Sequence, residues 1–335
     1  MKLNSVFALL VVLCYPASVF SARLDPAALG EFIQSMESDH GFDKAKLEKL
    51  FEGTERSDRI LELMSRPAEK VKPWWEYRAL FISDKRIRDG VKFWGENLAT
   101  LEQATEKTGV SPEIIVAIIG IETSYGRVTG SYKVIEALAT LAFHYPGNNV
   151  KRGRFFAAQL EHFLLLARED SLDPMSLLGS YAGAMGIPQF MPENYRKLAV
   201  DFNDDGKRDI WTSPADAIGS VANYFTHHGW IPDAPVMSPA RVASENVDAF
   251  LQKSIKPAKT LAEFERGNIR PTVENSNQDE SATLFQLTAR DGHEYWLTQS
   301  PFRFTACADA SRNDTVTTVT ALRIKMPKRR KYLLL

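Results

Sequence analysis

Residues 111–126 read SPEIIVAIIGIETSYG, and this stretch decides how the middle of the chain folds. Ser111 and Pro112 favour a helix start, with the serine side chain as the cap, and Glu113 places a negative charge near the positive end of the helix dipole. We therefore expect a helix from Pro112 to about Thr123. Its body is apolar on nearly every face, which in a soluble protein indicates burial within a domain.

Glu122 ends this apolar run. On a helix it shares a face with Ile118 and Ile119 one turn earlier, and with Tyr125 and Gly126 one turn later. Apolar surroundings favour the protonated carboxylic acid and raise its pKa, which suits a general acid working near neutral pH. The alternative is a structural or solvent-facing glutamate in a last helical turn, and periodicity alone leaves that alternative open.

The composition is that of an ordinary globular protein. The 335 residues are 44% apolar and 25% charged, which is enough for two or three packed subdomains. The 41 basic and 42 acidic side chains give a formal net charge of −1. A charge so close to zero provides no global field for nucleic acid or a charged membrane surface, so we expect no nucleic-acid partner.

Residues 1–21 have the pattern of a signal peptide, with Lys2 before an apolar run at 6–13 and small residues at the cleavage site. We expect a soluble periplasmic protein with no transmembrane span after cleavage. The run is too short to span a bilayer comfortably as a retained anchor. Leu13 before Cys14 argues against a lipoprotein, and cleavage would leave Cys307 without a disulfide partner.

The rest of the chain changes character three times. Residues 22–108 are predicted to be a helical N-terminal region, because apolar residues recur at spacings of three and four. Residues 109–230 carry the most informative motifs. Residues 231–300 are predicted to be a small β-containing part, with a hairpin whose turn is Asp291-Gly292. We therefore expect a mainly α, α+β protein, followed by a divergent tail at 301–335.

Several long motifs occur in a fixed order. They are the stretches 120–126, 137–143, 179–192 and 216–225. Together they resemble the membrane-bound lytic murein transglycosylase B family, over roughly residues 75–297. The resemblance implies a lysozyme-like catalytic core at 109–230. After about residue 300 the chain departs from the family pattern, which continues into an Arg-Tyr-Asn motif and an alanine-rich helix.

The resemblance also implies a reaction. Members of this family cleave the β-1,4 bond between N-acetylmuramic acid and N-acetylglucosamine in peptidoglycan and leave a 1,6-anhydro sugar. Glu122 would be the single catalytic residue, first as acid and then as base, with the substrate's N-acetyl group replacing a second carboxylate. The alternatives are a lysozyme-type peptidoglycan hydrolase and a non-catalytic peptidoglycan-binding protein. We expect a monomer without an organic cofactor.

The same resemblance implies how the 179–192 motif would bind a sugar. Its small residues would let the sugar approach the backbone closely, and its polar residues would form hydrogen bonds with the acetamido groups of the sugar. Tyrosines and a methionine would supply apolar surface for the sugar faces. A basic residue near 152 would contact muramyl carboxylates or peptide stems. The alternatives are turn-forming glycines, core aromatics and a solvated charged turn. The expected substrate-binding residues are Tyr77, Ser180, Tyr181, Met185, Gln189, Tyr224 and Arg152.

Residues 201–216 contain an acidic loop with EF-hand-like spacing: oxygen ligands at its first, third and fifth positions and a glycine at the sixth. The twelfth position is Thr212 rather than an acid, so the family's longer loop makes Asp216 the closing ligand. An Asx-rich surface turn is the alternative. The expected ligands of a structural Ca²⁺ are Asp201, Asn203, Asp205, Lys207 through its carbonyl, Asp209 directly or through water, and Asp216.

Overall fold

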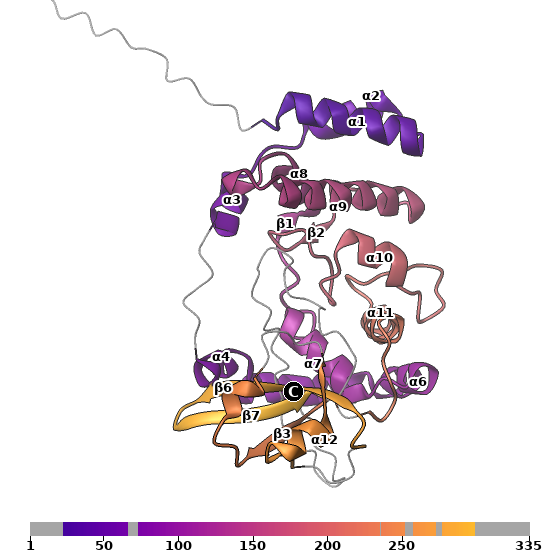
Figure 1. Cartoon of the computed structure of the whole chain (residues 1–335). Helices are drawn as coiled ribbons and strands as arrows, with labels where there is room; N and C mark the ends of the chain where they lie inside the picture. The colour runs from indigo at the N-terminus through magenta and orange to yellow at the C-terminus, as the bar shows by residue number, and fades with distance from the viewer. Residues whose placement is uncertain (1–22, 66–72, 235, 252–256, 273–276, 299–335) are drawn as a thin grey trace, which may run out of the picture.

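The computed structural model describes residues 23–65, 73–234, 236–251, 257–272 and 277–298. The predicted signal peptide at 1–21 and the tail at 301–335, with Cys14 and Cys307, lie outside the described residues. The mainly helical α+β class is confirmed: helices make up most of the described chain, and one small sheet lies at one end (Figure 1).

The leading helices have clear local start and stop signals. Asp25 caps the first one, because its carboxylate accepts hydrogen bonds from two backbone amides ahead of it, and Gly41 ends that helix in the left-handed conformation. Six helices precede residue 109 in the described chain: α1 (Pro26–His40), α2 (Lys44–Glu52), α3 (Asp58–Ser65), α4 (Trp74–Phe81), α5 (Asp84–Glu96) and α6 (Leu98–Thr108).

These six helices do not form a separate layer. Helix α3 packs against the middle of the chain, α5 and α6 pack around the helix that carries Glu122, and α4 contacts the small sheet. Figure 1 shows α1 and α2 at the end of the molecule opposite α4. A single hydrophobic cluster extends from Leu24 to Phe225, so the N-terminal helices and the central region share one core.

The central region is helical with a short β ribbon. Its elements are α7 (Pro112–Thr123), β1 (Tyr132–Lys133), α8 (Val134–Phe143), the 3-10 turn η1 (Pro146–Asn148), α9 (Val150–Glu169), β2 (Leu178–Gly179), α10 (Pro192–Leu198) and α11 (Pro214–His227). Strands β1 and β2 pair antiparallel through Tyr132 and Gly179. The ribbon therefore joins the segment after α7 to the 179–192 motif.

The last part is an antiparallel sheet of five short strands in the order β4-β6-β7-β3-β5. The predicted hairpin is present, with Ala289 paired to Gly292 across a two-residue turn. A small cluster around Phe264 and Leu284 forms its own core. The elements are β3 (Met237–Val242), η2 (Val247–Ala249), β4 (Lys259–Thr260), α12 (Leu261–Arg266), β5 (Ile269–Pro271), β6 (Ser281–Ala289) and β7 (Gly292–Thr298).

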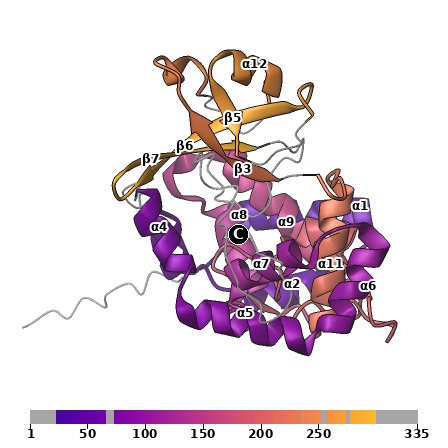
Figure 2. The same cartoon turned by 90° about the horizontal axis from the view of Figure 1, so that it is seen from below.

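Helix α4 links this sheet to the rest of the molecule. It contacts β6, and the guanidinium of Arg290 lies 5.0 Å from the centre of the Trp75 ring. Figure 2 shows α4 beside the β6–β7 hairpin, on the side of the sheet that faces the helices. Within the part of the chain that the structure describes, no helix is both long and apolar enough to cross a membrane.

Candidate active site

Helix α7 begins at Pro112 and ends at Thr123, as predicted. Ser111 precedes it, but the serine side chain makes no capping hydrogen bond, so the expected side-chain cap is wrong. Seven of its twelve residues are buried, which confirms the interior position inferred from its apolar body. Glu122 lies in the last turn and is only partly exposed. Its carboxyl group therefore lies at the boundary between the packed interior and the surface.

The chain leaves the helix directly after Glu122 and Thr123. Ser124, Tyr125 and Gly126 all have positive φ, at 52°, 65° and 80°. The expectation that Tyr125 and Gly126 continue the helical face of Glu122 is therefore wrong. The amide of Ser124 donates to the Gly120 carbonyl at 3.1 Å, and a left-handed turn of this kind satisfies carbonyls at a helix end.

Thr123 connects the end of α7 to the glycine-rich motif. Its buried hydroxyl donates to the Ile187 carbonyl at 2.9 Å and accepts from the Gly126 amide at 3.0 Å. Ile187 also packs against Gly126. Two motifs separated by 64 positions in the sequence thus meet beside Glu122.

The glycines of the 179–192 motif are required by contacts within the protein. Gly183 has φ of 82°, and an added Cβ would lie 2.4 Å from Cδ2 of Leu138. Gly186 has φ of 67°, and its Cβ would lie 2.5 Å from the Ile210 carbonyl oxygen. Both glycines are buried. These contacts support the turn-forming interpretation for the two glycines. That a sugar approaches their backbone closely stays a prediction.

Ser180 and Gln189 form bonds inside the same motif. The Ser180 hydroxyl oxygen accepts from the amide of Ala184 at 3.0 Å. The side-chain nitrogen of Gln189 donates to the carbonyl of Thr129 at 3.0 Å and to that of Gly186 at 2.8 Å. Gln189 thus ties the segment after α7 to the motif, and its Nε2 is already engaged within the protein.

The three apolar side chains expected to face a sugar differ in exposure. Tyr181 is partly exposed. Met185 is fully buried, and its backbone forms bridges within the motif. Tyr224 is 8% exposed, with its ring stacked on His228 at 4.1 Å. Met185 and Tyr224 are therefore both core residues in this structure. The 179–192 segment contacts α11 there, with the Phe190 and Tyr224 ring centres 5.6 Å apart.

Tyr77 and Arg152 lie on other elements. Tyr77 is on α4 and partly exposed, with its ring 5.1 Å from that of Phe81. Arg152 is at the start of α9, where its guanidinium lies 5.6 Å from the centre of the Tyr145 ring and within similar distances of two phenylalanine rings. The arginine is thus held against aromatic faces, which orients its charge.

The acidic loop is organised by its own amides. The two carboxylate oxygens of Asp201 accept from the amides of Asp205, at 3.1 Å, and Gly206, at 2.7 Å. Asp209 accepts from the amides of Trp211 and Thr212, so its carboxylate caps the turn at 211–212. Gly206 has φ of 86°, which explains the glycine at the sixth position.

Asp216 closes this loop from α11. Its side chain is fully buried, and its two oxygens accept from the amides of Phe202 at 2.9 Å and Asp209 at 2.8 Å. Burial raises the pKa of Asp216, and the nearby Asp201 carboxylate adds to the rise. Among the described residues no three His, Cys, Asp or Glu side chains form a ready metal cluster. A buried carboxylate beside a second one nevertheless fits a cation.

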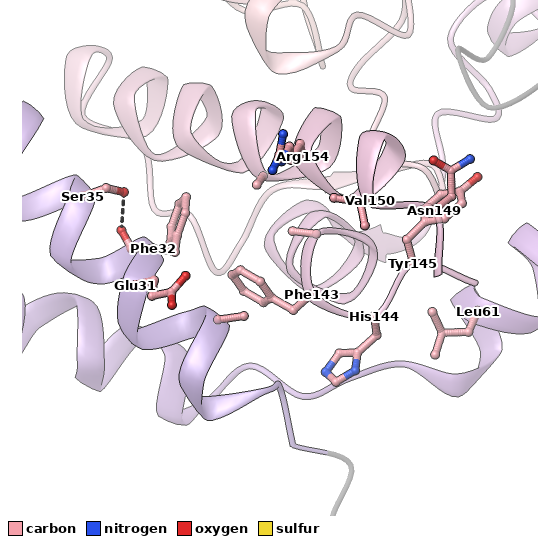
Figure 3. A pocket seen from close by; sticks show the side chains of 14 residues that line it. Glu31, Phe32, Ser35, Leu61, Phe143, His144, Tyr145, Asn149, Val150 and Arg154 are labelled. Atoms are coloured by element: carbon pink, nitrogen blue, oxygen red, sulfur yellow. Dashed lines mark hydrogen bonds between the residues drawn. The ribbon is translucent and has the colours of Figure 1, made fainter. Parts of the chain in front are cut away.

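A separate cavity of about 980 Å³ lies between α1, the end of α8 and the start of α9 (Figure 3). Phe32 and Phe143 form its apolar lining, and His144 and Arg154 are among its polar side chains. Neither Glu122 nor any residue of the 179–192 motif lines it. This cavity is therefore distinct from the region around the end of α7.

Comparison with known proteins identifies the class. The family model described as "Transglycosylase SLT domain" matches residues 25–306. Membrane-bound lytic murein transglycosylase B of Escherichia coli (strain K12) is 40% identical over 275 residues, covering 79% of this chain and 73% of that protein.

Two solved structures extend the match. The soluble lytic transglycosylase SltB1 from Pseudomonas aeruginosa is 46% identical with a TM-score of 0.77, covering 82% of this chain and 90% of that one. The Escherichia coli lytic transglycosylase SLT35 in complex with calcium is 37% identical with a TM-score of 0.75, covering 86% and 90%.

The helical core, the short β ribbon and the carboxylic acid at the end of a buried helix define a lysozyme-like lytic transglycosylase. The chain belongs to the transglycosylase SLT domain family, whose lytic members are peptidoglycan-cleaving lyases.

Proposed function

We propose that this protein cleaves the β-1,4 bond between N-acetylmuramic acid and N-acetylglucosamine in peptidoglycan, and that Glu122 is its catalytic residue. The observation that carries the proposal is the position of Glu122. It lies partly exposed in the last turn of a buried helix, and the next residue, Thr123, bonds that turn to the 179–192 motif. A carboxyl group held at such a boundary can reach a substrate while bulk water has limited access to it.

In the proposed reaction Glu122 first donates its proton to the glycosidic oxygen, and the bond between that oxygen and C1 of the muramyl residue breaks. The substrate's N-acetyl group stabilises the positive charge that develops at C1. The O6 hydroxyl of the same sugar then attacks C1, and the Glu122 carboxylate accepts its proton. The acid is regenerated, no water is consumed, and the product carries a 1,6-anhydro ring.

We propose a role in substrate binding for each predicted site residue, chosen to agree with its exposure and its hydrogen bonds. Tyr77 and Tyr181 are partly exposed and can lie against sugar faces. Gln189 can accept an acetamido N–H through Oε1, since its Nε2 bonds the protein. Arg152 can pair with a muramyl or peptide carboxylate. The conformation of the 179–192 motif, which carries Tyr181 and Gln189, is stabilised by Ser180, Met185 and Tyr224.

We also propose a structural calcium ion in the loop 201–216. Support comes from the spacing of Asp201, Asn203 and Asp205, from the buried Asp216 beside Asp201, and from the calcium complex of the similar SLT35 structure. Lys207 would contribute its carbonyl, and Asp209 would ligate the ion directly or through water while its Oδ1 caps the turn. Bound calcium would neutralise the acidic loop and fix the connection from α10 to α11, so its role is stability.

For location and partners we propose a periplasmic protein that acts as a monomer on glycan strands. The signal-like pattern of residues 1–21 supports the location, and the formal net charge of −1 argues against a nucleic-acid partner. The Escherichia coli relative is a membrane-bound lytic murein transglycosylase, whereas Leu13 before Cys14 here does not fit lipidation.

Mass spectrometry of the products from purified cell-wall sacculi tests the proposed reaction. We expect muropeptides that end in anhydromuramic acid, each lighter by one water than a reducing-end product. Reducing-end products would instead establish a lysozyme-type hydrolase. Binding to sacculi without release of soluble fragments would establish a non-catalytic binding protein.

A further inference from the structure

The carbonyl of Gly120, two residues before Glu122, accepts two hydrogen bonds. One comes from the Ser124 amide at 3.1 Å, as part of the left-handed turn that ends α7. The other comes from Nη1 of Arg86 at 2.9 Å, from helix α5. The last carbonyls of a helix lack partners within the helix and form its negative end, so a guanidinium there both satisfies a carbonyl and stabilises that end.

Helix α5 supports the same turn at a second point. Asp89, one turn after Arg86, forms an ion pair of 2.5 Å with Arg127 from the segment that follows α7. Lys85 pairs with the same carboxylate at 2.8 Å. Arg86 and Asp89 are three residues apart and therefore lie on one face of α5, which packs against α7. One helix face thus holds the chain just before and just after the strained turn.

The turn needs such support because its conformation is costly. Ser124 and Tyr125 are non-glycine residues with positive φ, a conformation that is unfavourable for residues with a Cβ atom. Tyr125 folds back over Gly120, where an added Cβ would lie 2.7 Å from the ring. Its hydroxyl is buried, and no described residue offers it a hydrogen bond. The backbone around Glu122 is therefore kept in place by contacts from outside α7, and Arg86 supplies one of them.

We propose that Arg86 is a positioning residue for Glu122, an inference that rests on the proposed function. Through the Gly120 carbonyl it fixes the last turn of α7, and so the direction in which the Glu122 carboxyl group points. A displacement of about 1 Å in a catalytic group can lower a rate by roughly 100-fold. Loss of Arg86 therefore lowers kcat and leaves substrate binding nearly unchanged.

The test is the steady-state release of anhydro ends from soluble, uncrosslinked glycan strands by wild type, Arg86→Ala and Arg86→Lys. We expect kcat of Arg86→Ala to fall roughly 10- to 100-fold, with KM within about twofold of wild type. Guanidinium ion at tens of millimolar should restore part of that kcat, and Arg86→Lys should retain most of it. Arg88→Ala, an exposed arginine on the same helix, is the matched control and should match wild type.

Three outcomes contradict the proposal. The first two are an unchanged kcat of Arg86→Ala and a raised KM with a normal kcat. The third is a loss of kcat that neither guanidinium ion nor the Arg86→Lys substitution restores, because that result would show a merely structural role for Arg86. If Arg86→Ala does not fold, Arg86→Met is measured instead, because methionine keeps the packing of the aliphatic part of the arginine side chain. A lower kcat of Arg86→Met supports the proposal, and an unchanged kcat overturns it. Wild type that releases no anhydro ends would overturn the proposed function itself, which separates the two failures.

Discussion

Two residues outside the carboxyl group itself hold the end of α7: Thr123, whose hydroxyl donates to the Ile187 carbonyl, and Arg86, whose guanidinium donates to the Gly120 carbonyl. The bounds of α7 follow from Pro112 and from the end of the apolar run at Glu122. The positive φ of Ser124 and Tyr125 has no such signal, because neither residue type is enriched in that conformation as glycine is. The contact between Arg86 and Gly120 spans 34 positions and depends on tertiary packing, so no local pattern predicts it.

His144 carries a prediction about pH. Its Nε2 accepts a hydrogen bond from the Asp25 amide at 3.0 Å, which requires the neutral ring, and burial lowers its pKa. The unfolded imidazole, with a pKa near about 6.5, binds a proton more readily than the folded one. The contribution of His144 is thus present above that pH and is lost as the pH falls through the lowered folded pKa.

We therefore expect the free energy of unfolding of wild type to fall between pH 7 and pH 5, and His144→Gln to show a smaller fall. Urea denaturation across this range measures it. His293→Gln, an exposed residue in β7, is the control and should keep the wild-type pH dependence. Parallel profiles for wild type and His144→Gln would contradict this role of the partly buried histidine.

At the scale of elements, helices and the hairpin were more predictable than the loops. Apolar periodicity and the Asp291-Gly292 pair indicated α7 and the β6–β7 hairpin, since both signals are local. The 179–192 motif has no regular period, so its sequence could not show that Met185 points into the core. Spacing in the acidic loop indicated its glycine turn, but not that Asp209 caps the turn at 211–212.

The acidic loop carries a prediction about metal. If calcium binds, it stabilises the folded protein by about 2.7 kcal/mol at 100 times its dissociation constant. We expect calcium to raise the Tm of wild type and EGTA to reverse the rise. In Asp216→Asn the response to calcium should be lost. Asp204→Asn is the matched control, because Asp204 is an exposed residue of the same loop outside the predicted ligand set.

Thermal unfolding with and without calcium makes this measurement. An equal rise in Tm for wild type and Asp216→Asn would show that Asp216 is not a ligand. No rise for wild type would favour the alternative of an Asx-rich turn held by its own amides.

On the scale of the whole molecule, the division of the hydrophobic core differs from the division of the sequence. Residues 22–108 read as a leading region, but the cluster that begins at Leu24 continues to Phe225. The sheet has a small core of its own, and a third, minor cluster surrounds Ala117 of α7 in the described chain. Sequence periodicity identifies which residues are buried but not which elements they pack against, so the distribution of the leading helices could not be predicted.

Separate cores predict separate stabilities. Phe264 is fully buried in the small cluster, so Phe264→Ala should cost about 3–5 kcal/mol there. We expect hydrogen exchange to speed up in residues 259–298 while α8 and α9 keep wild-type protection. Phe163→Ala, in the larger cluster, is the matched control and should weaken protection of α8 and α9. Loss of protection throughout the chain in Phe264→Ala would mean that the two cores unfold as one unit.

In the proposed reaction one carboxyl group, at the end of α7, performs both proton transfers. The direct measurement compares the release of anhydro-ended fragments from sacculi by wild type, Glu122→Gln and Glu113→Gln, the last being a glutamate at the opposite end of the same helix. We predict that Glu122→Gln folds normally and loses activity by roughly 100- to 10,000-fold, while Glu113→Gln stays near wild type. Retention of activity by folded Glu122→Gln would show that Glu122 does not perform the proton transfers.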